Sequence, residues 1–262
     1  MPDMTLQLLL TNDDGIASPG IAALRRALEG LGEVTTLAPA RDSSAVARSI
    51  TVDRALDTRR TSFGDGFTGL ALDGTPSDCV RVALLGVLTP TPDLVVSGIN
   101  LGSNLGADVT YSGTVGAALE AALRGAAGIA LSVESTEPRW LDEVVPLVRA
   151  IVRRAMEDGV PPHTVLNVNL PDLPPAGIRG VRPARLGGAS CHDSLTLAGD
   201  GEGVYRVPCD EPGDGDAAGV PTDFDVVAAG YIALTPLRYD LLDRGLLARL
   251  TAWDLDVEAV GR

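Results

Sequence analysis

The sequence predicts an α/β protein: a Rossmann-like, doubly wound and mostly parallel sheet, followed by an irregular, β-rich C-terminal extension and a terminal helix. Up to about residue 170, short apolar segments alternate with amphipathic ones, as expected when each strand is followed by a covering helix. After Pro171, proline and glycine become frequent and the strand signals shorten. We therefore divide the 262-residue chain into a Rossmann-like core of residues 1–170 and an extension of residues 171–262, expected to form one structural unit with the core.

The first half of the core contains signals for a strand, a helix, a second strand, a hairpin and a second helix. Residues 5–10 form an apolar run that ends in a turn, which is typical of a buried parallel strand. Ser18 supplies an N-cap and Gly30 follows the end of the helix predicted at residues 19–28. The remaining predictions are a strand at 33–38, a hairpin at 53–73 around Gly64-Asp65-Gly66, and a helix from 75 to about 88.

The second half continues the alternation of strands and helices. Residues 93–97 (DLVVS) predict a strand, and a glycine-rich loop extends from 98 to 113. Apolar residues spaced three and four apart predict helices at about 115–123 and 141–159. Further strands are expected at 129–133, 165–168 and 230–235, and the terminal helix at 240–250.

Composition limits the classes of function. The formal net charge is −14, and all 21 basic residues are arginines. We expect no stable nucleic-acid binding, which needs a basic face, and no mechanism that requires a lysine. No run of 18 uninterrupted apolar residues and no signal-peptide pattern is present, so we expect no membrane association.

The cysteines and histidines predict little chemistry. Cys79, Cys191 and Cys209 are odd in number and widely spread, which favours free thiols in a cytoplasmic location over a disulfide framework. His163 and His192 form no HxxxH pair and no CxxC is present, so a zinc site is not expected. We expect neither histidine to be catalytic and Cys79 to lie in the core.

Oxygen-bearing side chains follow several of the predicted strands. Asp13 and Asp14 come directly after the first strand, Ser43 and Ser44 after the second, and Asn100 three residues after DLVVS. Doubly wound sheets bind ligands outside the carboxyl ends of their strands. Carboxylate, hydroxyl and amide oxygens together suit Mg²⁺ or Mn²⁺. Each segment alone is an ordinary turn or loop, but their shared position favours a metal site.

A second polar group surrounds the start of the helix at about 115. Ser112-Gly113-Thr114 lies where free N–H groups and the helix dipole would attract phosphate. An ordinary N-cap explains one of these residues. It does not explain a 16-residue loop with four glycines and two asparagines, because loops of that length are usually functional. This segment is not the lysine-containing phosphate loop of nucleotide triphosphatases.

Five segments then show a family resemblance. TNDDGI-ASPGI, AP-ARDSSAVARSIT, GTPSDCV, PDLVVSGINLGSNLGADVTYSGTVGAALEA and TDFDVVAAGYIALTPL resemble, in order, the motifs of the survival protein SurE family, and they extend from Thr11 to Leu237. The resemblance implies a metal-dependent phosphatase of nucleoside 5′-monophosphates, often also of 3′-monophosphates and in some members of short polyphosphate. It also implies a C-terminal extension exchanged between subunits of a homodimer or homotetramer.

The resemblance assigns roles to individual residues. One divalent metal ion per subunit would be bound by Asp13, Asp14, Ser44 and Asn100, and phosphate by Asn104, Ser112, Gly113 and Thr114. The sequence departs from the family pattern after the ligand serine, where Ala45 replaces the usual glycine, so Ser43 is the alternative ligand.

These assignments predict hydrolysis of a phosphomonoester by metal-activated water. Asp13 would orient or deprotonate the water, and Asn104 would hold phosphate oxygens where charge develops. Two alternatives remain open. One is a phosphatase with an aspartyl nucleophile, a scheme that commonly uses DxD spacing and a lysine. The other is a non-catalytic nucleotide or phosphate sensor with a metal-filled crevice.

Overall fold

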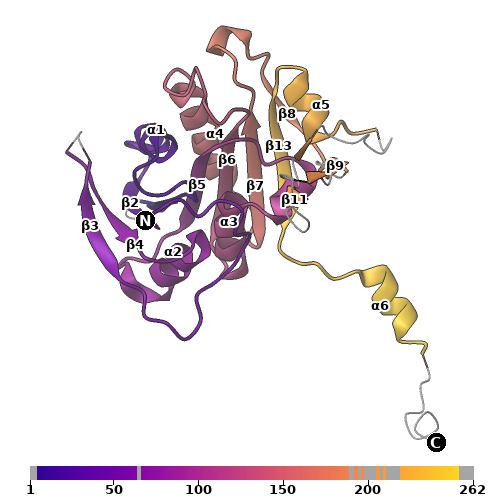
Figure 1. The fold of residues 1–262 in the computed structure, drawn as a ribbon, viewed down its shortest axis with the longest axis horizontal. Helices are drawn as coiled ribbons and strands as arrows, with labels where there is room; N and C mark the ends of the chain where they lie inside the picture. Colours follow the sequence, from indigo (N-terminus) through magenta and orange to yellow (C-terminus); the bar gives the residue numbers. More distant parts are fainter. Residues whose placement is uncertain are drawn as a thin grey trace, which may run out of the picture.

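The structure, a computed structural model, describes residues 5–63, 66–188 and 219–253, with four two-residue strands between the last two ranges. In this part of the chain a nine-stranded sheet has the order β3-β4-β2-β1-β5-β6-β7-β13-β8 (Figure 1). The strands are β1 (Gln7–Thr11), β2 (Glu33–Pro39), β3 (Thr58–Ser62), β4 (Thr68–Leu72), β5 (Leu94–Leu101), β6 (Ala127–Val133), β7 (Thr164–Leu170), β8 (Val181–Pro183) and β13 (Ile232–Arg238). All neighbours pair in parallel except β3 with β4 and β7 with β13. The predicted fold class is confirmed.

Helices cover both faces of the sheet. Successive side chains of a strand point to opposite faces, so Leu8 and Leu10 of β1 enter one core and Leu9 the other. The first core packs against α1 (Pro19–Leu28) and α4 (Val145–Asp158). The second packs against α2 (Pro76–Val82) and α3 (Gly113–Leu123). The result is a three-layer molecule in which the central strands of the sheet are buried on both sides, whereas the outer strands β3 and β8 are largely exposed.

The order of the strands places the topological switch point of the sheet beside β1. The chain passes from β1 through α1 to β2 on one side, and later returns to place β5 on the other side. The connections therefore diverge at the carboxyl ends of β1 and β5, which is where doubly wound sheets bind ligands.

Two predicted boundaries were wrong. β5 continues to Leu101, with a shift in pairing between Ser97 and Asn100, so Asn100 lies within the strand and the following loop is shorter than expected. A 3-10 helix, η2 (Gly106–Thr110), occupies part of that loop. The helix expected to reach residue 88 ends as α2 at Val82, and a π-helical turn, η1 (Ala83–Val87), follows it. Gly86 has φ 115° there, which an α-helix cannot accommodate.

The part after Pro171 contributes to the same sheet. β8 and β13 extend it beyond β7, and α5 (Asp223–Ala228) packs beside them. The sequence predictions missed α5, although Thr222 and Asp225 form a capping box that marks its start. The two-residue strands β9 (His192–Asp193), β10 (Thr196–Leu197), β11 (Tyr205–Arg206) and β12 (Cys209–Asp210) form two antiparallel pairs.

The terminal helix α6 (Arg244–Leu250) stands away from the sheet (Figure 1). Leu246, Leu247 and Leu250 are exposed on it. None of the described helices is long and apolar enough to cross a membrane. The predicted hairpin is confirmed by β3 and β4, but its turn residues Gly64 and Asp65 lie outside the described residues, as does Cys191.

Candidate active site

Asp13 is held at the end of β1 by the first turn of α3. Its side chain is 3% exposed. The backbone N–H of Thr114 donates to Asp13 Oδ2 at 3.0 Å, and the Thr114 hydroxyl donates to Asp13 Oδ1. A Cβ atom on Gly113 would lie 2.8 Å from Asp13 Cβ, so only glycine permits this approach. The helix N-terminus thus orients a carboxylate rather than facing solvent.

Asp14 lies beside Asp13 and faces the end of β5. It is partly exposed, and the N–H of Leu101 donates to Asp14 Oδ2 at 3.4 Å. Burial and the neighbouring charge of Asp13 raise the pKa of Asp14 to about 7. Burial also raises the pKa of Asp13, against the opposing effect of the Thr114 hydrogen bonds. Within the described residues neither carboxylate forms an ion pair with an arginine. Such an uncompensated pair favours binding of a cation.

Asn100 is the amide of this group. Its Nδ2 donates to the carbonyl oxygen of Gly102 at 2.7 Å, which fixes the amide and leaves its own carbonyl oxygen for a ligand. In the sheet, Asn100 lies opposite Ser132 of β6. The next residue, Leu101, donates its N–H to Asp14, so Asn100 lies beside that carboxylate. Two neighbouring strands, β1 and β5, therefore supply oxygen atoms to one edge of the sheet.

The loop after β2 brings the serines to the same edge. The N–H of Ser43 donates to the Asp13 carbonyl oxygen at 2.8 Å. The Ser44 hydroxyl donates to Asp42 Oδ1 at 2.6 Å, whereas the Ser43 hydroxyl donates to the Arg41 carbonyl at 3.4 Å. Ala45 has φ 56°, so it adopts the left-handed conformation that glycine adopts without strain. Although alanine replaces the family's glycine at position 45, the loop backbone keeps the left-handed conformation that a glycine would favour there.

Separate Ser44→Ala and Ser43→Ala variants will identify the ligand serine. Ser44→Ala should weaken the apparent Mn²⁺ affinity by at least about 10-fold, since even outer-shell partners of a metal typically contribute that much. Ser43→Ala should change it less than about 2-fold, because its hydroxyl makes only a long bond to Arg41. The Mn²⁺ dependence of phosphate release measures both. The reverse order would assign the ligand to Ser43.

Asn104 is buried and rigidly held on the β6 side. Its Nδ2 donates to Ser132 Oγ at 2.7 Å, and its N–H donates to Asn169 Oδ1 at 2.8 Å. Its carbonyl oxygen accepts from Asn167 Nδ2 at 2.9 Å and Asn169 Nδ2 at 3.0 Å. The sequence analysis missed Ser132, Asn167 and Asn169. A signal was present, because asparagines two apart in an otherwise apolar strand share one face.

The predicted phosphate segment has protein partners of its own. Ser112 caps α3 by accepting from the Val115 N–H at 3.0 Å, and the Thr114 groups bind Asp13. Of the backbone amides in this segment, that of Gly113 has no hydrogen-bond partner among the described residues. A phosphate contact by Ser112, Gly113 and Thr114 stays a prediction.

Several other side chains have structural surroundings. His163 Nδ1 lies 2.9 Å from the carbonyl oxygen of Ala122, and its ring meets Tyr239 edge-on. Cys79 is fully buried, and burial raises the pKa of its thiol. Asp223, which the sequence analysis missed, accepts from the N–H groups of Gly106 and Gly187 at 2.8 Å each and joins the loop after β5 to the C-terminal extension.

The fold and these side chains define a class of protein. It is a doubly wound α/β protein in which a carboxylate pair, an amide and a serine-bearing loop lie at the switch point of the sheet, next to a helix N-terminus. The chain belongs to the survival protein SurE family, whose model, described as "Survival protein SurE", matches residues 8–193.

Individual relatives agree with this membership. The chain is 41% identical over 248 residues to a protein of Pseudomonas putida named 5′-nucleotidase SurE, with 95% of this chain and 98% of the relative covered. It is 42% identical over 263 residues to the protein of the same name from Rubrobacter xylanophilus, with the same coverage. The crystal structure of the SurE protein from Aquifex aeolicus matches 94% of this chain and 98% of its own, with a TM-score of 0.81 and 38% identity.

Proposed function

We propose that this protein is a metal-dependent 5′-nucleotidase that hydrolyses nucleoside 5′-monophosphates to nucleoside and phosphate. The main supporting observation is the Asp13–Asp14 pair, which has no arginine partner among the described residues and adjoins Asn100 at the switch point of the sheet. Family membership adds the substrate class, because curated relatives of this length are named 5′-nucleotidases.

Asp13, Asp14, Ser44 and Asn100 would hold one Mg²⁺ or Mn²⁺ ion per subunit. Their oxygen atoms match the preference of these hard cations. Only two of the four are carboxylates, in keeping with the lack of any cluster of three Asp, Glu, His or Cys suited to a metal in the described part of the chain. The ion supplies Lewis-acid chemistry, polarising the phosphoryl group and activating water.

The side chains around the ion perform the remaining tasks. Asn104 is held by Ser132 and Asn169, so its position is set before substrate binds, as effective electrostatic stabilisation of developing charge requires. The free N–H of Gly113 offers a second donor for a phosphate oxygen. Asp13 would orient the attacking water or accept its proton.

The geometry argues against Asp13 as a covalent nucleophile. Thr114 fixes the orientation of the Asp13 carboxylate through hydrogen bonds to both oxygens, and the remaining lone pairs would be directed at the metal ion and the attacking water. A nucleophile needs a free oxygen in line with the phosphorus atom. Direct attack by water therefore fits this arrangement better than a phosphoenzyme.

Incubation of the pure protein with AMP and Mn²⁺, followed by measurement of free phosphate, tests the proposal. The nucleotidase releases phosphate over many turnovers, whereas a nucleotide or phosphate sensor binds AMP and releases none. Labelled phosphate retained on acid-quenched protein would favour the aspartyl nucleophile.

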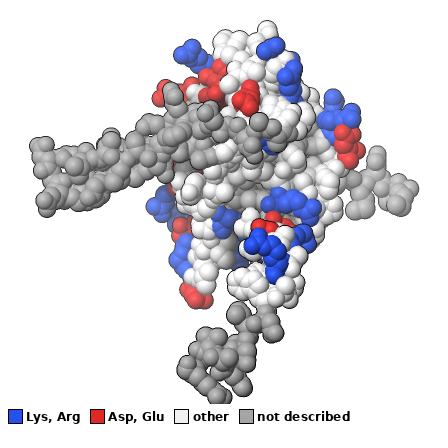
Figure 2. All heavy atoms as spheres, turned by 90° about the vertical axis from the view of Figure 1, so that its right-hand side faces the viewer, with Lys and Arg blue, Asp and Glu red and all other residues white. Residues whose placement is uncertain are grey.

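The wider properties of the family extend the proposal. Activity towards 3′-monophosphates and short polyphosphate, and a cytoplasmic location, follow from the resemblance and from the free-thiol chemistry of the sequence. Nucleic acid is not an expected partner, because the chain carries a net charge of −14. On the face drawn in Figure 2, arginines lie in separate groups and several adjoin acidic residues.

We also expect a homodimer or homotetramer that residues 171–262 help to form. Leu246, Leu247 and Leu250 expose apolar surface on α6, which stands apart from the sheet, and among the described residues nothing covers it, so this surface suits contact with a second subunit. Light scattering at micromolar concentration should give the mass of two or four chains. A Leu246→Asp, Leu247→Asp double variant should contain a larger fraction of monomers than the unmodified protein. If the unmodified protein is itself a monomer, the expectation is wrong.

A further inference from the structure

The loop of residues 41–51, which carries Ser44, has an unfavourable backbone conformation that contacts with the surrounding protein must stabilise. Ala45 and Ala47 have φ 56° and 53°, a left-handed conformation that is unfavourable for a residue with a side chain. The loop also crosses the first turn of α3 at close range. The Ala47 N–H donates to the Tyr111 carbonyl at 2.8 Å, and a Cβ atom on Gly116 would lie 2.5 Å from the Ala47 carbonyl oxygen. Such strained conformations persist only where surrounding contacts determine them.

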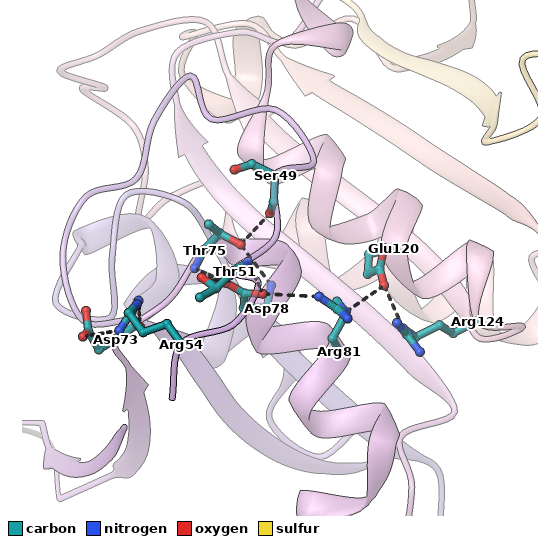
Figure 3. Close-up of polar contacts among 9 residues, drawn as sticks. All are labelled: Ser49, Thr51, Arg54, Asp73, Thr75, Asp78, Arg81, Glu120 and Arg124. Carbon is teal, nitrogen blue, oxygen red and sulfur yellow. Dashed lines mark hydrogen bonds and ion pairs between the residues drawn. The ribbon is translucent and has the colours of Figure 1, made fainter. Parts of the chain in front are cut away.

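Asp78 of α2 binds the far end of this loop (Figure 3). Its two oxygens lie 3.0 and 3.1 Å from the Thr51 N–H, and the Thr51 hydroxyl donates to Oδ2 at 2.6 Å. The Thr75 hydroxyl, on the same helix start, donates to the Ser49 carbonyl at 2.7 Å. Asp78 is only 1% exposed. Burial by itself would raise its pKa, but the hydrogen bonds from Thr51 and Thr75 together hold it below the ordinary value.

The same carboxylate is linked to α3. Arg81 lies 3.7 Å from Asp78 and 3.9 Å from Glu120 of α3, and Arg124 donates to Glu120 at 2.7 Å (Figure 3). Pro76, two residues before Asp78, would meet a Cβ on Gly113 at 3.2 Å. Gly113 is also the residue that adjoins Asp13. Asp78 therefore joins the Ser44 loop to the helix that orients the first aspartate.

We propose that Asp78, through Thr51 and Thr75, is a positioning residue that holds the Ser44 loop over the N-terminus of α3 and so keeps the serine at the metal site. This inference rests on the proposed metal-dependent function. Asp78 itself touches neither metal nor substrate. Its loss lets residues 41–51 relax from the strained path, which moves Ser44 away from Asp13 and weakens metal binding.

The chain offers a matched control for the structural part of this role. Asp78 also closes a capping box with Thr75, which contributes to the stability of α2. Asp225 closes the same box with Thr222 at the start of α5, where the Thr222 hydroxyl donates to Asp225 Oδ2 at 2.6 Å. Asp225→Asn therefore reproduces the loss of a cap without touching the Ser44 loop.

The experiment compares Asp78→Asn, Thr51→Val and Asp225→Asn with the unmodified full-length protein. Two measurements need no turnover: the dissociation constant of Mn²⁺, from free-ion electron paramagnetic resonance, and the hydrogen exchange of residues 41–51 without metal. Asp78→Asn and Thr51→Val should weaken Mn²⁺ binding by about 10-fold, the lower end for an outer-shell residue. Asp78→Asn and Thr51→Val should also speed the hydrogen exchange of residues 41–51. Asp225→Asn should change neither the Mn²⁺ affinity nor this exchange. High Mn²⁺ should restore most of kcat to Asp78→Asn.

The outcomes separate this inference from the proposed function. Unchanged Mn²⁺ affinity and loop exchange in folded Asp78→Asn would overturn the positioning role, while the nucleotidase proposal would stand. Equal changes in Asp78→Asn and Asp225→Asn would also overturn it, because a general loss of helix capping would then explain them. Failure of the unmodified protein to bind Mn²⁺ would contradict the proposed function itself.

Discussion

Removal of divalent metal with EDTA should abolish phosphate release from AMP, and added Mn²⁺ or Mg²⁺ should restore it. Uncatalysed hydrolysis of phosphate monoesters is so slow that enzymes accelerate it by up to roughly 10²¹-fold. No lysine is present in the chain, and the described histidine, His163, binds the carbonyl of Ala122. A bound metal ion would therefore supply positive charge at a site where neither Asp13 nor Asp14 forms an ion pair with an arginine among the described residues. We expect activity to fall at least about 100-fold.

The measurement is phosphate release before chelation, after EDTA and gel filtration, and after metal is returned. Circular dichroism of the EDTA-treated protein controls for unfolding. Full activity in a metal-free sample would remove the basis for assigning Asp13, Asp14, Ser44 and Asn100 as ligands.

Asp14→Asn should lower kcat/KM by about 100-fold or more while the protein stays folded. The substitution removes one ligand charge without changing shape, and losing a single group that stabilises the transition state typically costs 10²–10³ in kcat. An exposed carboxylate serves as the matched control: Asp142, whose side chain is 79% exposed, should tolerate the same change to asparagine with nearly full activity. Wild-type turnover of Asp14→Asn at saturating metal would instead make Asp14 a turn residue.

The same variant should be more stable than the unmodified protein when both are metal-free. The pKa of Asp14 is about 7 in the folded protein, above its ordinary value of 3.8. The folded state therefore holds this proton over a pH range where the unfolded chain has released it, so stability falls as pH rises from about 4 to about 7. The asparagine of the variant does not titrate, so the variant does not lose stability in this way as the pH rises.

Thermal melts in EDTA test this pH dependence. The melting temperature of Asp14→Asn should exceed that of the unmodified protein by an amount that grows between pH 4 and 7 and is level above it. Saturating Mn²⁺ should reverse the order, because a bound ion stabilises the folded state of the protein that retains its ligands. A constant difference across this pH range would contradict the shifted pKa.

Local sequence patterns were sufficient to predict most of the helices and strands. The apolar run before Thr11 and the Ser18 cap each depend on neighbours within a few residues, and the structure confirms β1 and α1. The strands and helices that alternate along the core likewise produced the correct fold class. Boundaries failed where backbone geometry rather than side-chain pattern decides, as at the shifted pairing before Asn100 and at Gly86.

The residues of the candidate site also fall into two groups: those that local sequence patterns predict and those that they do not. Asp13, Asp14 and Asn100 were predicted to lie together because they come at or just after the carboxyl ends of parallel strands, which meet at one edge of a sheet. Their partners could not be found from spacing. Thr114 lies 101 residues from Asp13, and Asp78 lies 27 residues from Thr51.

The sequence by itself therefore determined the α/β class, the family and the candidate oxygen-bearing residues, because these follow from periodicity, strand ends and motifs. Only the tertiary structure decided that the start of α3 binds Asp13, that Asn104 binds Ser132 and Asn169, and that Asp78 binds Thr51. The physical reason is that each of these hydrogen bonds joins segments far apart in the chain. Their angles and distances are set by how helices and strands pack, which no local pattern records.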